Sequence, residues 1–167
     1  MNVTLPAVVS GAVTWWSGLY SDHHAVSVTV RFLHLAALVV GGGTALVVDR
    51  HVLGAARRID ASARQAALAL AGRSHRIVVP ALAIMALTGV LMAAADLETY
   101  LPSRLFWTKM AFVALLVTNG ALLVGAERAA AAGANERVWV RLRVASAASA
   151  ALWLTTLLAG TWLTVGA

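Results

Sequence analysis

Two ionisable side chains lie inside long apolar stretches of the chain, and both are of a type that does chemistry. His34 follows the run VSVTVRFL, and Lys109 follows LFWT. A charge is costly in an apolar environment, so such a group is a functional candidate by default. A neutral imidazole is a common haem or metal ligand, and a nearby lysine can pair with a propionate, ligate iron when deprotonated or anchor an anionic substrate. We therefore treat His34 and Lys109 as a candidate cofactor-binding pair.

Each of these residues also has a structural interpretation, and two further residues fit a cofactor pocket. His34 can hydrogen-bond a backbone or hydroxyl group, and the Lys109 ammonium can reach the membrane surface on its flexible stem. Gly41 follows His34 by seven residues, so on a helix it shares the His34 face and lets a flat ligand approach the backbone. Trp153, in the middle of a later apolar stretch, can wall the same pocket or pack in the core.

A second candidate site is a metal site with His34, His23, His24 and Met92 as ligands. His23 and His24 precede the first apolar stretch, and Met92 lies near the end of the second. Imidazole suits copper, and thioether sulfur suits Cu(I) in particular. The alternative is that the two adjacent histidines are solvated and that Met92 fills the core.

Four apolar windows must position these residues. The chain has 167 residues, of which 60% are hydrophobic and 12% charged, whereas a soluble domain is nearer half apolar and a quarter charged. A span needs about 20 apolar residues to cross a bilayer core of about 30 Å. The windows that qualify are 26–48, 77–95, 105–126 and 144–165, and none alternates with period two. The sequence therefore predicts an all-α fold, an integral membrane bundle of four transmembrane helices over 26–167.

The charged residues predict how this bundle is oriented. Arginines gather in two connections, six between the first two windows, together with Asp49 and Asp60, and four between the last two, together with Glu127 and Glu136. By the positive-inside rule both connections are cytoplasmic, which places both termini outside a bacterial-type inner membrane. The net charge of +6 then follows from topology, so we expect no nucleic acid as a partner. The expected surroundings are the lipid bilayer, with anionic lipid near the arginines.

Residues 1–25 form a separate segment before the first window. The first 20 residues contain no Lys or Arg, so they lack the charged region of a secretory signal. Trp15, Trp16 and Tyr20 are side chains that favour a membrane interface. We expect a short helix or hairpin that lies on the outer membrane face.

Two residues inside the windows have predicted structural roles. Pro80 is expected in the first turns of the second transmembrane helix, where its missing N–H costs least. Asn119 lies deep in the third window, and we expect it to hydrogen-bond across to a neighbouring helix.

The chain lacks the residues that several kinds of catalytic or metal site require. The chain has no Cys, which excludes disulfides, thiolate metal sites and iron–sulfur clusters. It also lacks a Ser–His–Asp arrangement, a Gly-rich phosphate loop and an HExxH helix. In the predicted topology His75 lies about half the bilayer or more from His34, too far to share one haem iron with it. We interpret His75 and His51 as interfacial or structural, or as contacts to a headgroup or quinone.

Three segments resemble a known arrangement of membrane helices. FLHLAALVVGGGTAL, LTGVLM and LFWTKMAFVALLVTNGALL, within residues 30–126, resemble the membrane domain of the copper-resistance protein D (CopD) family. The same plan is similar to the HemJ-type protoporphyrinogen oxidases, four-helix membrane proteins that carry haem b and depend on a His in the first span and a Lys at the start of the third. The resemblance implies that His34 and Lys109 are the functional pair.

The leading hypothesis is a membrane protein that binds one haem b, a related porphyrin or a metal in its outer half and works in redox or cofactor handling. One alternative is a non-catalytic accessory subunit of a larger respiratory or photosynthetic membrane complex, or a homo-oligomer. The other alternative is copper handling.

Overall fold

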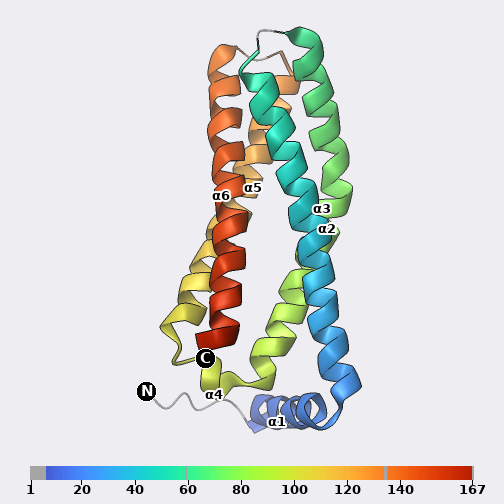
Figure 1. Ribbon diagram of the computed structural model, residues 1–167, viewed down its shortest axis with the longest axis vertical. Helices are drawn as coiled ribbons and strands as arrows, with labels where there is room; N and C mark the ends of the chain where they lie inside the picture. Colours follow the sequence, from blue (N-terminus) through green and yellow to red (C-terminus); the bar gives the residue numbers. More distant parts are fainter. Residues whose placement is uncertain (1–6, 59, 134, 167) are drawn as a thin grey trace.

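Four long helices dominate the structure, a computed structural model that describes residues 7–58, 60–133 and 135–166. The helices are α1 (Ala7–Asp22), α2 (His24–Ala56), α3 (Ala61–Ala95), α4 (Leu97–Tyr100), α5 (Arg104–Ala131) and α6 (Glu136–Gly166). In Figure 1, α2, α3, α5 and α6 run side by side, and α1 lies across one end, which we call the α1 end. The α2–α3 and α5–α6 connections lie at the opposite end, which we call the loop end.

The predicted all-α bundle is confirmed for the described residues, and the four long helices are apolar and long enough to cross a membrane. They are longer than the predicted windows, however. α3 begins at Ala61 because ASARQAALALAG consists mainly of good helix formers. α2 has 33 residues, which at 1.5 Å per residue gives about 50 Å, well above the bilayer core of about 30 Å.

Asp60 explains where α3 starts. Its carboxylate accepts hydrogen bonds from the Ser62 backbone N–H at 2.9 Å and from the Ser62 hydroxyl at 2.8 Å. This is an N-cap, which satisfies a backbone donor that the first turn of a helix leaves free. The hydrogen bonds from Ser62 favour the charged carboxylate, so they hold the pKa of Asp60 below its ordinary value.

The helices pair as two hairpins, α2 with α3 and α5 with α6, and α2 also packs along α6, whereas α3 and α5 touch only slightly. The main buried core lies toward the loop end. It consists of small and medium side chains from all four long helices: Val48, Val52, Ala55, Ala67, Ala71, Ala130, Trp139 and Leu142. The bundle is therefore tightest where the two connections meet.

Arg64 links the two hairpins at the loop end. Its guanidinium donates two hydrogen bonds to the Glu136 carboxylate, at 2.8 and 3.0 Å, and lies 4.6 Å from the centre of the Trp139 ring. The Arg64 Nε also donates to the Arg58 carbonyl, at 3.1 Å. One side chain thus joins the α2–α3 connection to the start of α6.

Pro80 lies well inside α3, not in its first turns, because the helix begins far upstream of the predicted window. A proline inside a helix removes one backbone hydrogen bond and bends the helix. α3 changes direction where it passes behind α2 (Figure 1), and its second half leans across the α1 end.

Of the two forms expected for the N-terminal segment, a short helix or a hairpin, the structure has a helix, α1, which docks on the end of α3. The Trp16 indole N–H donates to the Leu91 carbonyl at 2.8 Å, and the Ser17 hydroxyl donates to the Ala95 carbonyl at 2.7 Å. Trp15, the residue before Trp16, is 68% exposed. α1 therefore presents one tryptophan to the bundle and the other to its surroundings.

Candidate functional site

The His34 side chain is held from one side by a hydrogen bond to α3. Its Nδ1 lies 2.9 Å from the Thr88 hydroxyl oxygen, and Thr88 is buried. The same hydroxyl donates its proton to the Ile84 carbonyl at 2.6 Å, so it is free only to accept from His34. This assigns the proton to Nδ1 and the lone pair to Nε2. A hydrogen bond from His34 to a hydroxyl group is one of the two roles that the sequence predicts for this residue.

Lys109 enters the same half of the bundle from α5. It is half-buried and lies against α6, where its Nζ is 3.5 Å from the position that a Cβ on Gly160 would take. Its charge acts on the His34 ring, which places the two side chains in one electrostatic environment. Among the residues that the structure describes, none forms a hydrogen bond or an ion pair with this ammonium.

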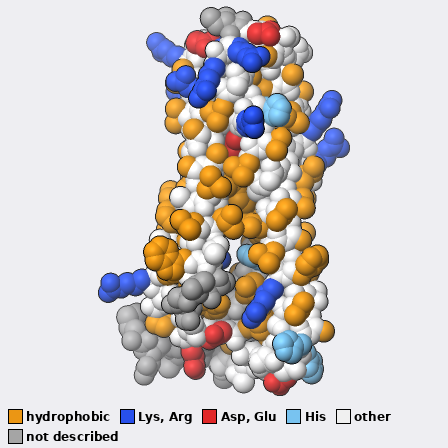
Figure 2. Space-filling model, in the orientation of Figure 1, with side chains coloured by type: hydrophobic (Ala, Val, Ile, Leu, Met, Phe, Trp, Pro, Cys, Tyr) orange, Lys and Arg blue, Asp and Glu red, His pale blue; other side chains and the backbone are white. Residues whose placement is uncertain are grey.

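Small residues and one unpartnered hydroxyl surround the pair. A Cβ on Gly89 would lie 3.5 Å from the His34 ring, in ordinary contact. Thr156, one turn before Gly160 on α6, is 8% exposed, and its hydroxyl has no hydrogen-bond partner. Among the described residues, this half of the bundle thus offers the His34 imidazole and a Lys109 ammonium without a carboxylate partner, which suits a ligand with a metal centre and an anionic group. Figure 2 shows a hollow on this face between two columns of apolar side chains.

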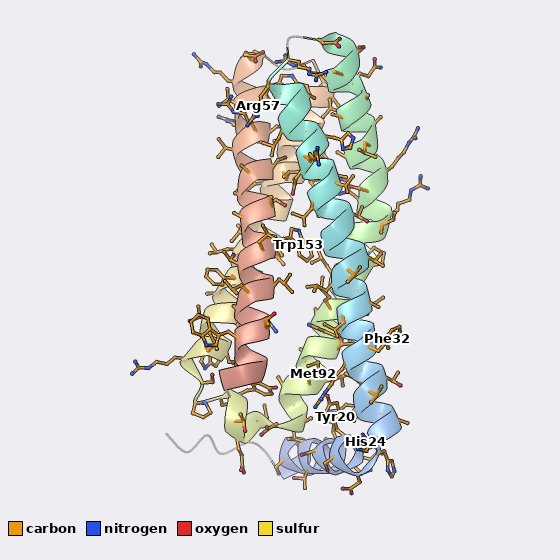
Figure 3. All side chains as sticks on the ribbon, viewed as in Figure 1. Tyr20, His24, Phe32, Arg57, Met92 and Trp153 are labelled. Carbon is orange, nitrogen blue, oxygen red and sulfur yellow. The ribbon has the colours of Figure 1, made fainter. Side chains whose placement is uncertain are left out.

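Gly41 and Trp153 lie at helix crossings. A Cβ on Gly41 would approach the Ala81 Cβ to 2.7 Å, so α3 fills the groove that was expected to admit a flat ligand. Trp153 is 6% exposed and packs on Gly42 of α2, with its ring 3.1 Å from the position of a Cβ there. Figure 3 shows Trp153 between α6 and α2, near the middle of the bundle. Both residues set helix spacing, and their place in a cofactor pocket stays a prediction.

The residues predicted for copper do not gather into one cluster with His34. His23 precedes α2, His24 begins it, and both are exposed, whereas Met92 lies on α3 and is half-buried. Figure 3 places His24 at the corner between α1 and α2 and Met92 further along the bundle. Within the described ranges no group of three His, Cys, Asp or Glu side chains is placed to hold a metal ion.

Asp49 and Glu127 were expected in the arginine-rich connections, but the structure buries both within helices. Asp49 is 3% exposed in α2, and Glu127 is 7% exposed in α5. The Glu127 carboxylate is 2.8 Å from the His75 Nε2, so His75 is a contact between α3 and α5. A sequence signal did exist: Leu123 and Ala130 lie four residues before and three after Glu127, on one helix face.

The predicted hydrogen bond of Asn119 is confirmed. Its side-chain amide donates to the Ala145 carbonyl at 2.9 Å and so joins α5 to α6.

Comparison with known proteins gives a family and no function. No curated protein and no solved structure matches the chain. Residues 13–166, which cover α2 to α6 and most of α1, match a family described as a family of unknown function (DUF6644). The chain belongs to this family.

Proposed function

We propose that this membrane protein binds one haem b, a related porphyrin or a metal at the α1 end, and that it works in redox or cofactor handling. His34 is the proposed ligand through Nε2, and Lys109 is the proposed partner for a propionate or another anionic group. When bound, a haem would supply one-electron chemistry. The observation that carries the proposal is the His34 ring, which the Thr88 hydroxyl fixes through Nδ1 so that the lone pair is on Nε2.

A fixed ring is what a ligating histidine needs. In metal sites the second ring nitrogen usually donates to an oxygen, which sets the tautomer and the ring orientation. The Thr88 hydroxyl does this for His34, because its own proton goes to the Ile84 carbonyl. A histidine that served only to join α2 to α3 would gain nothing from a free Nε2 inside the bundle.

The unpaired Lys109 ammonium supports an anionic ligand. A charge inside a membrane bundle is normally paired or turned to water. Lys109 instead lies half-buried beside Gly160, with no carboxylate partner among the described residues. A propionate would supply the missing charge, and the free Thr156 hydroxyl would add a hydrogen bond.

The test is the visible spectrum of the detergent-purified protein, reduced minus oxidised, after expression with haem supplied. We expect a Soret band in the wild type, its loss in His34→Ala and a weakened band in Lys109→Met. The matched control is His51→Ala, which removes an imidazole from α2 whose Nδ1 bonds the Val47 carbonyl at the other end of the helix. This control should keep the full band.

Two outcomes would overturn the haem proposal: a wild type without a Soret band, or a band that survives both site substitutions. Metal analysis of the same samples tests copper handling, which requires copper in the wild type and its loss when His23 and His24 are both replaced by Ala. A colourless, metal-free wild type would exclude both.

We also propose an orientation, supported by the arginine-rich loop end. The positive-inside rule places that end in the cytoplasm, with α1 and the site on the outer face of a bacterial-type inner membrane. Reporter fusions after Gly166 test this, because a reporter active only outside the cytoplasm should be active there.

An accessory role in a larger complex is favoured by one observation. A Cβ on Gly120 or Gly125 of α5 would meet nothing within 4 Å, so small residues face outward there. Such residues allow the helix of another subunit to approach closely. Stoichiometric purification with a large complex, together with a colourless protein, would favour this role over haem binding.

A further inference from the structure

A second group of buried polar side chains lies toward the loop end, away from His34 and Lys109. We call it the buried acidic cluster; its buried members are Asp49 (α2), Glu127 (α5), and Ser146 and Ser149 (α6), and the half-buried His75 (α3) contacts Glu127 at its edge. Ser146 is fully buried, at 0% exposure. Each of the four long helices contributes to it, and neither the sequence analysis nor the proposed function uses it.

Three oxygen atoms of this cluster are buried without a hydrogen-bond partner. They are Asp49 Oδ2, Glu127 Oε1 and Ser146 Oγ. Ser146 and Ser149 lie beside the Asp49 carboxylate, and Glu127 lies on α5, which packs along α6. An unsatisfied buried oxygen is costly, so each of these three oxygens calls for a partner.

The charges of the cluster do not balance. His75, which faces Glu127 at 2.8 Å, carries one positive charge when protonated. The neighbouring basic residues on the four helices are exposed: Arg50 and His51 on α2, Arg73 and Arg76 on α3, Arg128 on α5, and Arg141 and Arg143 on α6. Two ionised carboxylates would therefore leave one buried negative charge unpaired, which is strongly unfavourable.

The geometry favours a proton as the positive charge that compensates the unpaired carboxylate. In the part of the chain that the structure describes, no three His, Asp or Glu side chains converge as metal ligands do. A carboxyl group that carries a proton becomes a hydrogen-bond donor, so it can satisfy an oxygen that now lacks a donor. Water fits the remaining positions, because buried water binds where several polar groups are unsatisfied.

We propose that the buried acidic cluster is a proton-binding site, in which Asp49 and Glu127 hold a proton, with water, taken up from the loop end through His75. The uptake transfers a proton from a hydronium ion at the loop end to a carboxylate oxygen: one O–H bond breaks, one forms, a water molecule is left and no oxidation state changes. His75 suits the entry because its side chain is 33% exposed while the Glu127 side chain is 8% exposed. The site does not depend on haem or on any ligand at the α1 end.

Infrared spectroscopy of the full-length protein in detergent at neutral pH tests the proposal, because a protonated carboxyl group absorbs separately from a carboxylate. We expect a carboxylic-acid carbonyl band in the wild type that shifts in heavy water. Asp49→Asn or Glu127→Gln should remove or shift the band, and Glu98→Gln, a carboxylate exposed on α4, should leave it unchanged. His75→Phe should slow the heavy-water shift. Circular dichroism verifies that each variant is folded, and the two substitutions on separate helices provide independent tests.

The result that would overturn the proposal is a neutral-pH spectrum without this band, or a band that both cluster substitutions leave unaltered. Thermal unfolding in sodium, potassium and choline chloride completes the test. Stabilisation by sodium that is lost in Asp49→Asn, with no carboxylic-acid band, would show that a metal cation occupies the cluster and would also overturn the proposal.

Discussion

A methyl group added at Gly41 has no room, because its carbon would lie 2.7 Å from the Ala81 Cβ. Ala81 is buried and its Cβ is fixed to the backbone, so it cannot rotate away and α2 and α3 must separate. Forcing extra volume into a packed interior costs about 1–3 kcal/mol. Replacing a helical Gly by Ala recovers about 0.5–1 kcal/mol of helix propensity, which partly masks this cost.

Gly43→Ala is the matched control for Gly41→Ala. It lies two residues further along α2, and a Cβ there meets nothing within 4 Å. The control therefore carries the propensity gain without the clash. We expect Gly41→Ala to lower the free energy of unfolding by about 1–3 kcal/mol relative to Gly43→Ala. The measurement is equilibrium unfolding in mixed micelles, followed by circular dichroism.

The double variant Gly41→Ala/Ala81→Gly moves the methyl group from α3 to α2 without adding volume. We expect it to regain most of the lost stability, with a coupling energy inside the range of about 0.5–3 kcal/mol found for contacting residues. Equal effects of Gly41→Ala and Gly43→Ala, or a double variant no better than the sum of its single changes, would refute the close crossing. If Gly41→Ala left the stability unchanged but abolished haem binding, Gly41 would instead line the ligand pocket.

Three further predictions concern contacts made by single side chains. Asp60→Ala should lower the melting temperature at neutral pH. Because folding lowers the pKa of Asp60, the charged cap stabilises the protein at pH values above the ordinary pKa of an aspartate. The difference in melting temperature from the wild type should therefore vanish as the pH falls through the folded-state pKa. Asn119→Ala should cost about 1 kcal/mol in unfolding in detergent, whereas Thr118→Ala, whose hydroxyl bonds its own helix, should cost less. Trp16→Phe should release α1 and speed its cleavage by protease, and Trp15→Phe should not.

The parts of the fold that depend on residue type alone were predictable. Apolar windows of about 20 residues predict transmembrane helices because the bilayer sets their length. A lone amide such as Asn119 predicts a contact between helices, since little else can satisfy it inside the bundle. The aromatic residues of the N-terminal segment indicated an interfacial segment but left a helix or a hairpin open, and the structure has a helix over Ala7–Asp22.

The ends of the helices and the buried carboxylates were not predictable from hydropathy. An apolar window ends at the first charged residues, whereas a helix ends where its backbone hydrogen bonds end. Asp49 and Glu127 were therefore assigned to connections, although both lie in runs without a helix breaker. Their burial depends on how four helices pack together, which a single helix does not reveal.

The contact between His34 and Thr88 was predictable only in part. Both residues were within predicted windows, and the depth of His34 suggested a functional role. The Thr88 partner could not be identified, because it depends on how far α3 is rotated and shifted along α2. The same rotation placed Ala81 against Gly41 and closed the expected groove.

The extra length of the helices means that the two ends of the bundle are held together by different forces. At the loop end, the core around Val52 and Leu142 lies at the level of the arginines, where water is the competing solvent. There the hydrophobic effect drives assembly. Further toward the α1 end lipid replaces water, so association depends on close packing and hydrogen bonds. Urea added to the aqueous phase should therefore weaken the loop end first, while a change of acyl-chain length should act first on the half that contains His34 and Lys109.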